Sequence, residues 1–333
     1  MGTCAASSGE ALAVVRDLSV TYADDSASTV RALSRASIEI RAGEFLGILG
    51  ESGSGKSTLG AALLRLLPGH GRYDRGSITF LGRDLLKLDE PDLQQIRGAE
   101  IALIPQDPAL ALNPVMCAGA QIAEVLLAHT PVRGPELRKR VEELLAEVGF
   151  QRPVEIYSAY PHQLSGGQRQ RIAITQAMAC RPKLVIADEP TSKLDASLQI
   201  EILSLMREIS SRHQTAFILI SHDPAVLAGF VERIAVMYAG CIVEEGRTED
   251  IFQRPLHPYT QALVRLSGRY LFGEGNRTRF SMIAGEQTRT PGVTAGCPFA
   301  PSCPERMPVC GERDPVEISP QPMHRVSCFK YGE

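Results

Sequence analysis

The sequence predicts an α/β fold built on a mostly parallel sheet. The first observation is four short apolar runs, at residues 45–49, 101–104, 184–187 and 216–220. Their continuous rather than alternating apolarity is typical of strands buried on both faces of a parallel sheet. The second observation is that ligand-type side chains follow each run closely: Lys56-Ser57 after a glycine-rich loop, Gln106, Asp188-Glu189 and Ser221-His222-Asp223. Because ligands bind beyond the carboxyl ends of such strands, we expect these segments to form one site.

Length and composition indicate a globular chain of about two domains. The chain has 333 residues, of which 44% are apolar and 22% charged, and a domain has roughly 150 residues. The net charge of −3 gives no reason to expect a nucleic-acid partner, because phosphate binding favours a basic surface. No apolar run approaches the roughly 18–20 residues that span a bilayer.

The N-terminal residues lack the basic start and apolar stretch of a secretory signal, and Ala6 departs from a myristoylation pattern. We interpret the segment up to about Glu10 as a disordered leader. A chain without an export signal stays in a reducing cytoplasm, so its eight cysteines are not interpreted first as disulfides.

The loop after the first apolar run matches the pattern G-x-x-x-x-G-K-[ST] in full. Its residues are Gly50, Glu51, Ser52, Gly53, Ser54, Gly55, Lys56 and Ser57, with Thr58 directly after them. The glycines let backbone N–H groups curl around phosphate oxygens, and the next helix adds its positive N-terminal end. We expect Lys56 to reach the β- and γ-phosphates and the Ser57 hydroxyl to bind Mg²⁺. A buried strand before the loop and the stripe Leu59-Leu63-Leu64-Leu67 after it favour this over a merely structural glycine loop.

The acidic pair Asp188-Glu189 would by default be a solvated turn. Beside a phosphate loop a sharper interpretation fits: Asp188 holds Mg²⁺, directly or through water, and Glu189 orients and deprotonates the attacking water. Most of the seven histidines are interpreted as ordinary surface or loop residues. His222 ends a buried strand, which favours a contact with the γ-phosphate.

A further motif lies between Gln106 and Asp188: Leu164-Ser165-Gly166-Gly167-Gln168. A serine and two glycines that open a basic helix form a second anion-binding helix N-terminus. In this position LSGGQ is the signature of the ABC ATPases, and the chain resembles that family over about residues 11–267. The order of the elements is the family's as well: phosphate loop, Gln106, LSGGQ, Asp188-Glu189, residues 192–195 and His222.

The resemblance implies a P-loop NTPase core of the RecA-like kind with a mixed or parallel sheet. It adds an ABC-type antiparallel β subdomain and a helical subdomain at about residues 107–165. It implies ATP and Mg²⁺ as ligands and a head-to-tail sandwich dimer in which each LSGGQ closes the partner's nucleotide. The implied roles are catalysis for Glu189, His222 and Gln106, Mg²⁺ binding for Ser57, Gln106 and Asp188, and nucleotide contact for Asp195 in addition to the two loops.

Comparison with the family pattern gives three further features. Tyr22 matches the aromatic that stacks on adenine, with a core tyrosine as the alternative. The loop at residues 106–114 resembles the segment that grips coupling helices of transmembrane subunits. Lys193 is a departure, since relatives usually carry a small residue there, and it would place a charge near the dimer seam. A stripe at helical spacing predicts one apolar face of the helical subdomain: Leu137, Val141, Leu144, Leu145 and Val148.

The C-terminal region differs in composition. Residues 268–296 are interpreted as a linker. Four of the eight cysteines fall in the last 37 residues, among prolines that exclude a helix: Cys297, Cys303, Cys310 and Cys328. So short a segment lacks an apolar core and needs a staple, which in a reducing cytoplasm is expected to be a metal site rather than disulfides. The spacing matches neither a zinc knuckle nor a common ferredoxin run, so zinc and iron–sulfur both stay open.

The tail, with residues 255–260 before it, resembles the C-terminal extension of the dipeptide/oligopeptide/nickel branch of ABC importers. The resemblance implies a [4Fe–4S] cluster on the four cysteines, in a structural or regulatory role, with zinc or metal-free thiols as alternatives. It divides the chain into a nucleotide-binding domain at 1–267 and a linker with a Cys-rich extension at 268–333.

The sequence therefore predicts a peripheral ATPase at the cytoplasmic face of the cell membrane that energises import of di- and oligopeptides. Its expected partners are a second ATPase subunit, expected to be a different sister chain, two transmembrane permease subunits and, indirectly, an external binding protein. Nickel–chelate, opine or glutathione-type cargo is the alternative. A soluble ABC ATPase of repair or translation is disfavoured, because the chain has neither a long coiled-coil insert nor a second cassette.

Overall fold

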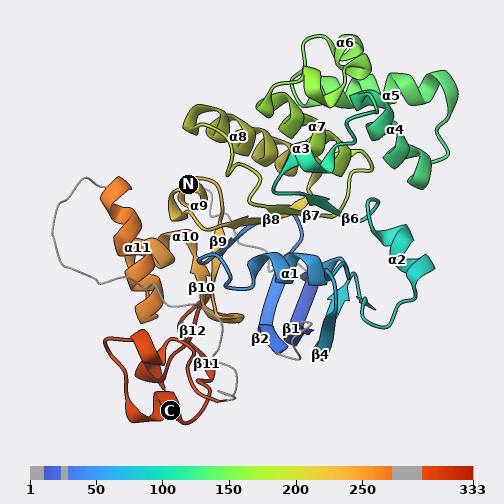
Figure 1. Cartoon of the computed structure of the whole chain (residues 1–333). Helices are drawn as coiled ribbons and strands as arrows, with labels where there is room; N and C mark the ends of the chain where they lie inside the picture. Colours follow the sequence, from blue (N-terminus) through green and yellow to red (C-terminus); the bar gives the residue numbers. More distant parts are fainter. Residues whose placement is uncertain (1–10, 24–28, 272–294, 333) are drawn as a thin grey trace, which may run out of the picture.

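The computed structural model describes residues 11–23, 29–271 and 295–332. The larger of its two sheets has eight strands (Figure 1). The first five, all parallel, are β6 (Ile101–Ile104), β7 (Leu184–Asp188), β8 (Ala216–Ser221), β3 (Phe45–Leu49) and β9 (Arg233–Tyr238). Three antiparallel strands continue the sheet: β10 (Cys241–Arg247), β12 (His324–Ser327) and β11 (Glu317–Gln321).

The four strands predicted from continuous apolar runs are confirmed as β3, β6, β7 and β8. Every residue of β3 and β8 is buried. The expectation of burial on both faces is wrong for Leu103 of β6, which is 41% exposed. Because β6 is the edge strand of the sheet, its side chains have a neighbouring strand on one side only.

The smaller sheet is antiparallel, as the family resemblance implied. Its strands, in spatial order, are β2 (Thr29–Arg41), β1 (Ala11–Ala23), β4 (Gly71–Phe80) and β5 (Arg83–Asp84). Together with α1 (Lys56–Leu63) and α2 (Glu90–Ile96), it packs on one face of the large sheet. The helix α1 is shorter than the predicted leucine stripe, because Arg65 adopts a left-handed backbone with φ of 51°. Leu67 therefore lies beyond the helix, although it still contacts this core.

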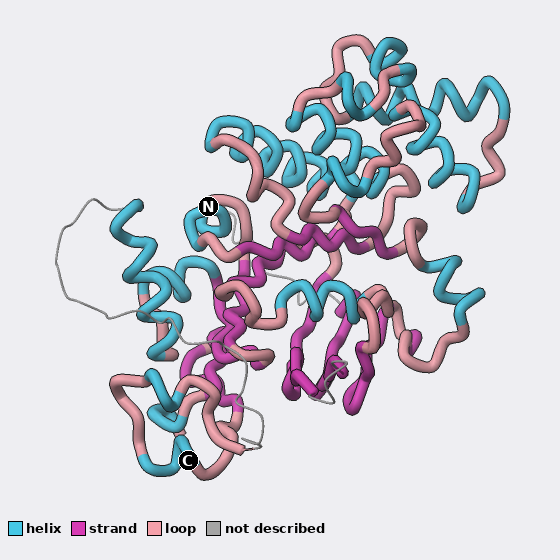
Figure 2. The backbone as a smooth tube through the Cα atoms, in the orientation of Figure 1, coloured by secondary structure: helices cyan, strands magenta, loops and turns pink. Residues whose placement is uncertain are grey.

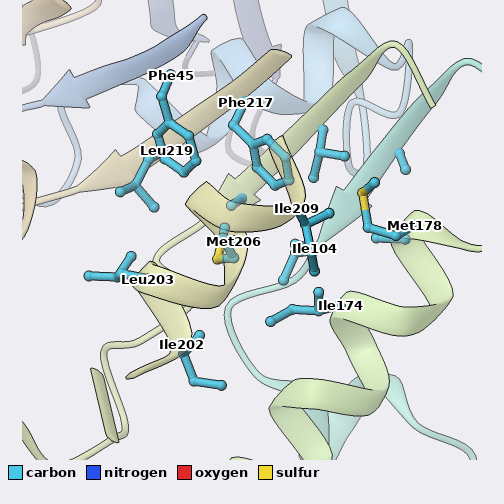
Figure 3. Packing of buried hydrophobic residues seen from close by; sticks show 14 of the residues in the cluster. Phe45, Ile104, Ile174, Met178, Ile202, Leu203, Met206, Ile209, Phe217 and Leu219 are labelled. Carbon is cyan, nitrogen blue, oxygen red and sulfur yellow. The ribbon is translucent and has the colours of Figure 1, made fainter. Parts of the chain in front are cut away.

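The opposite face of the large sheet is covered by α7 (Gly166–Met178) and α8 (Ala196–His213) (Figure 3). Alternate strand residues point to the two faces, so Val185 and Ala187 join this core while Leu184 and Ile186 join the other. Phe45 and Phe217 stack on the helical side with ring centroids 5.1 Å apart. The sheet is thus held between two apolar layers, which fixes the position of its strand ends.

A group of helices packs around α7 (Figures 1 and 2), with α4, α5 and α6 on the side away from the sheet. The members are α3 (Pro108–Ala111), α4 (Ala118–His129), α5 (Gly134–Glu147), α6 (Pro153–Ser158) and the 3₁₀ turn η1 (Pro161–Gln163). The predicted apolar stripe on α5 is confirmed: Val141, Leu144, Leu145 and Val148 are buried, and Leu137 packs beside them. In the part of the chain that the structure describes, no helix has the length and apolarity needed to cross a membrane.

The remaining helices are α9 (Pro224–Ala228), α10 (Thr248–Gln253) and α11 (Pro258–Leu271). Because α11 continues to Leu271, the first four residues of the predicted linker are helical. Residues 272–294 of that linker, like the predicted leader at 1–10, lie outside the described residues.

The described tail, residues 295–332, has no α-helix, as predicted. It contains the 3₁₀ turns η2 (Ala300–Ser302), η3 (Pro308–Gly311) and η4 (Phe329–Tyr331) in addition to β11 and β12. The expectation of a segment without an apolar core needs correction. Phe299 is 2% exposed and packs on Tyr238 and Tyr259, within the same apolar cluster that continues under α7 and α8. The strand β12 extends the large sheet by pairing with β10.

A buried carboxylate joins this tail to the rest of the fold. The Glu244 side chain accepts hydrogen bonds from the backbone N–H groups of Leu256 and His257, both at 2.8 Å. His324 on β12 places Nε2 2.7 Å from the same carboxylate, with both side chains fully buried. Beside it Arg325 of β12 pairs with Glu245 of β10. One acidic pair on β10 therefore fixes both the start of α11 and the C-terminal hairpin.

We predict that Glu244→Gln lowers the free energy of unfolding by about 1–3 kcal/mol, because the amide NH₂ leaves buried donors without an acceptor. Urea denaturation of the full chain measures the loss. Glu249→Gln, at an exposed position of α10, is the matched control and should leave stability unchanged. Equal stability of the two variants would contradict the role given to Glu244.

Candidate functional site

The glycine-rich loop connects β3 to α1, in the position that the sequence predicted. Two of its glycines stand where a larger side chain would be strained. A Cβ on Gly50 would lie 2.4 Å from the Met237 carbonyl oxygen, and Gly55, the N-cap of α1, has a φ of 101° that L side chains rarely adopt. The Ser54 hydroxyl is buried without a hydrogen-bond partner among the described residues. The loop is therefore a closely fitted backbone cradle.

Lys56 folds back over this loop. Its Nζ donates to the carbonyl oxygens of Gly50 and Glu51 at 2.8 and 2.7 Å. Burial lowers the pKa of Lys56, while the nearby carboxylates of Glu189, Asp188 and Glu51 oppose that shift. The carboxylates thus favour the charged ammonium, and only two of its three N–H donors bond the carbonyl oxygens, so the third is available to an anion.

Ser57 and Asp188 meet beyond the carboxyl ends of β3 and β7. The Ser57 hydroxyl donates to Asp188 Oδ1 at 3.1 Å, although the two residues are far apart in sequence. Burial raises the pKa of Asp188, and the hydrogen bond from Ser57 opposes the rise. A hydroxyl and a carboxylate are oxygen donors of the kind that Mg²⁺ takes alongside waters and phosphate oxygens. The pair therefore fits the predicted Mg²⁺ ligands, and Gln106 contacts Glu189 instead.

Glu189 lies at the centre of the remaining polar residues. Gln106 Nε2 donates to Glu189 Oε2 at 3.1 Å, and His222 Nδ1 lies 2.8 Å from Oε1. The carboxylate is only 14% exposed, and its backbone has a φ of 44°. A non-glycine residue in this conformation costs of order 1–3 kcal/mol and persists where surrounding contacts enforce it. Here the Glu189 N–H donates to the Ile220 carbonyl of β8 at 3.1 Å.

Lys193 has a partner that the sequence did not indicate. Its ammonium forms an ion pair with Asp107, directly after Gln106. The hydrogen bond from Lys193 lowers the pKa of Asp107. The charge near the expected dimer seam is thus matched within the chain.

The LSGGQ segment caps the helix α7. The Ser165 hydroxyl accepts from the Gln168 N–H at 3.3 Å, and Gln168 Oε1 accepts from the Ser165 N–H at 2.9 Å. A Cβ on Gly167 would lie 2.7 Å from a Leu198 methyl group of α8. Among the described residues, no hydrogen bond or ion pair joins this segment to the phosphate loop. The helix N-terminus that the sequence predicted is present, but it does not complete the site of its own chain.

The other predicted nucleotide contacts are more dispersed. Asp195 caps α8 by accepting from the Leu198 N–H at 3.0 Å, and Thr58 lies in the first turn of α1. Tyr22 lies near the end of β1, partly buried, with its ring against Gly71. The adenine contact of Tyr22 and the nucleotide contact of Asp195 stay predictions.

The four tail cysteines line one cavity together with His257 and Phe299. Burial raises the pKa of Cys297 to about 12 and also raises the pKa of Cys303 and Cys328. Metals bind thiolates, so the donor chemistry fits but needs deprotonation. Over residues 11–23, 29–271 and 295–332, however, no three His, Cys, Asp or Glu side chains are arranged to hold a metal ion. The predicted metal site is therefore not confirmed.

One residue in contact with the site was missed. The Tyr259 hydroxyl accepts a hydrogen bond from the backbone N–H of Glu51 in the phosphate loop at 3.2 Å. The sequence marked residues 255–260 only as part of a resemblance, and nothing local indicates a contact 208 positions away.

Comparison with known proteins identifies the family of the chain. The profile of the family described as "ABC transporter" matches residues 33–192, and that of "Oligopeptide/dipeptide transporter, C-terminal region" matches residues 243–310. The chain is 41% identical to the oligopeptide transport ATP-binding protein OppD of Escherichia coli (strain K12) over 321 residues, 96% of this chain and 94% of that protein. It is 43% identical to the dipeptide transport ATP-binding protein DppD of Haemophilus influenzae over 305 residues, 92% and 91% of the two chains.

Among solved structures, a dimeric post-hydrolysis state of the ATP-binding cassette MJ0796 bound to ADP and Pi has a TM-score of 0.64 to this fold. The two are 28% identical, over 71% of this chain and 98% of that one. The fold and site define the class as an ABC-type ATPase. The chain belongs to the ABC transporter family, in the branch of the oligopeptide and dipeptide transport ATP-binding proteins.

Proposed function

We propose that the site binds ATP through the phosphate loop and hydrolyses it with Glu189 as the general base. The observation that supports this is that two groups of residues meet at the carboxyl ends of the strands. One group is Lys56, Ser57 and Asp188, and the other is Gln106, Glu189 and His222. The loop N–H groups and Lys56 hold the β- and γ-phosphates. Ser57 and Asp188 would hold Mg²⁺, which supplies positive charge against the phosphate oxygens.

Glu189 orients a water molecule and takes its proton as the water attacks the γ-phosphate. His222 and Gln106 contact this carboxylate in the structure. When ATP binds, His222 would contact the γ-phosphate and Gln106 would bind Mg²⁺. Tyr22 stacks on adenine, and Asp195 and Thr58 complete the nucleotide contacts.

A second ATPase subunit completes the site. The N-terminus of α7, with the sequence LSGGQ, presents backbone N–H groups suited to an anion. Within the described ranges of the chain, no hydrogen bond or ion pair joins it to its own phosphate loop. A head-to-tail dimer, with an identical chain or a sister chain, brings each signature to the partner's nucleotide. The solved relative described above is itself dimeric and bound to ADP and Pi.

We predict that Glu189→Gln lowers ATP hydrolysis by at least about 10²-fold, because the amide cannot accept the proton of the attacking water. ATP binding should survive, and the variant should accumulate as an ATP-closed dimer. Phosphate release, equilibrium binding and size-exclusion chromatography measure the three effects, with Glu249→Gln as control. Hydrolysis at the parent rate would show that Glu189 is not the base.

We further propose that the chain energises import of di- and oligopeptides from the cytoplasmic face of the membrane, as a peripheral subunit under two permease subunits. An external binding protein would deliver the cargo. The names of the relatives support this, as do exposed apolar side chains in the segment after Gln106: Leu110 is 85% and Val115 78% exposed. Such side chains suit a surface that receives the coupling helices of another protein. Nickel–chelate, opine or glutathione-type cargo is the alternative within the same assembly.

Co-purification tests the importer proposal. The affinity-tagged full chain, extracted from its native membranes in mild detergent, should bring down two integral membrane subunits. In vesicles with the binding protein, that complex should accumulate a labelled tripeptide only with ATP. Transport of a nickel chelate but no peptide would favour the alternative cargo. Recovery without any integral membrane partner would contradict the importer role.

For the tail we propose a [4Fe–4S] cluster held by Cys297, Cys303, Cys310 and Cys328, with zinc as the alternative. Four thiols around one cavity support it. Its role would be structural or regulatory, and it would tie η2, η3 and η4 together. We also keep the division into a nucleotide-binding domain at 1–267, with its helical subdomain at about 107–165, and a linker with extension at 268–333.

Cys303→Ser should remove the visible absorbance of an iron–sulfur cluster from anaerobically purified protein, because a hydroxyl is a poor ligand for the cluster. Cys117→Ser, at the N-cap of α4 and away from the cavity, is the matched control and should keep the absorbance. A colourless parent protein with zinc by elemental analysis would favour zinc. A colourless protein without metal would contradict both forms of the proposal.

A further inference from the structure

The peptide group between Gly50 and Glu51, at the start of the phosphate loop, is held from both sides. Its carbonyl oxygen accepts from Lys56 Nζ at 2.8 Å, and its N–H donates to the Tyr259 hydroxyl at 3.2 Å. The two contacts differ in their fate when a nucleotide binds. Lys56 has a third N–H donor, which can bond a phosphate oxygen and draw the ammonium toward it. The Tyr259 contact approaches from α11 and involves no group that is needed for phosphate.

Tyr259 is rigidly placed for this contact. Its side chain is fully buried, and its ring packs on Tyr238 at the end of β9, with centroids 4.6 Å apart. The Tyr259 N–H donates to His257 Nδ1 at 3.1 Å, which fixes the first turn of α11. A buried ring with packed neighbours cannot swing away, so its hydroxyl is a fixed point against which the loop peptide is oriented.

The third neighbour of Tyr259 comes from the C-terminal extension. The Phe299 ring lies 5.5 Å from the Tyr259 ring and 5.3 Å from the Tyr238 ring, between centroids. Phe299 also packs against His257 and lines the cavity of the four cysteines. A continuous path of packed rings thus runs from the extension to the phosphate loop, with one hydrogen bond as its last step.

We propose that Tyr259 is a positioning residue of the phosphate loop, and that the extension, through Phe299, sets how firmly Tyr259 holds the Gly50–Glu51 peptide and thereby the affinity for ATP. This rests on the proposed binding of phosphate by that loop. A peptide fixed before the ligand arrives reduces the ordering cost of binding. Docking of the extension therefore contributes to the affinity for ATP.

Tyr259→Phe tests the first step, because it keeps the ring packing and removes only the acceptor for the Glu51 N–H. Titration of the full chain with ATP should show a Kd raised about three- to tenfold, the equivalent of one neutral hydrogen bond. The hydrolysis rate at saturating ATP and the melting temperature should stay near the parent values. Tyr238→Phe is the matched control: it removes a hydroxyl from the same ring cluster that makes no hydrogen bond to the loop among the described residues.

Phe299→Leu tests the second step. Its Kd for ATP should rise in the same direction, and in the Tyr259→Phe background it should add little, because both changes act through one contact. Fully additive effects would overturn the path through Tyr259, and a Tyr259→Phe Kd equal to that of the parent would overturn the proposal as a whole. If Phe299→Leu does not fold, the Tyr259→Phe and Tyr238→Phe pair still decides the first step. A parent chain that does not bind ATP would instead contradict the proposed function.

Discussion

Parallel pairing of β3, β8 and β7 is the constraint on which the site depends. The register places Leu49 of β3 opposite Ser221 of β8, and Ile220 of β8 opposite Asp188 of β7. The three strands therefore end at the same level of the sheet. The phosphate loop, the acidic pair and His222 leave the sheet from those ends, so backbone hydrogen bonding alone brings them together. Packing on both faces of the sheet then holds these strand ends in place.

The features that could be predicted from sequence are those encoded locally. Continuous apolar runs indicated four strands of a parallel sheet, and the ligand-type residues after each run indicated that the strand ends form one site. Contacts between distant segments could not be predicted. Lys193 pairs with Asp107 across 86 positions, and neither residue alone indicates the other. The left-handed backbone of Glu189 is likewise set by its contact with β8. The predicted leucine stripe extended past the end of α1, because the spacing of leucines does not reveal that Arg65 adopts a left-handed backbone.

The C-terminal extension shows how a sequence argument can fail through its premise. A segment of this length cannot build its own core, which made a staple physically necessary. The structure supplies another solution: β12 joins the large sheet, Phe299 enters the existing core, and His324 shares Glu244 with α11. These contacts tie the tail to the rest of the fold. The proposal of a cluster consequently rests on four thiols around one cavity, and not on a need for cross-links.

The same contacts connect the extension to the phosphate loop. Phe299 contributes to a core that also contains Tyr259, and Tyr259 contacts the loop peptide whose carbonyl holds Lys56. Coupling between two binding equilibria is reciprocal. If a docked extension strengthens ATP binding by orienting that peptide, bound ATP strengthens docking of the extension by the same factor. The chain then has a physical means by which events at the cysteine cavity and occupancy of the phosphate loop influence each other, through packed rings and one hydrogen bond.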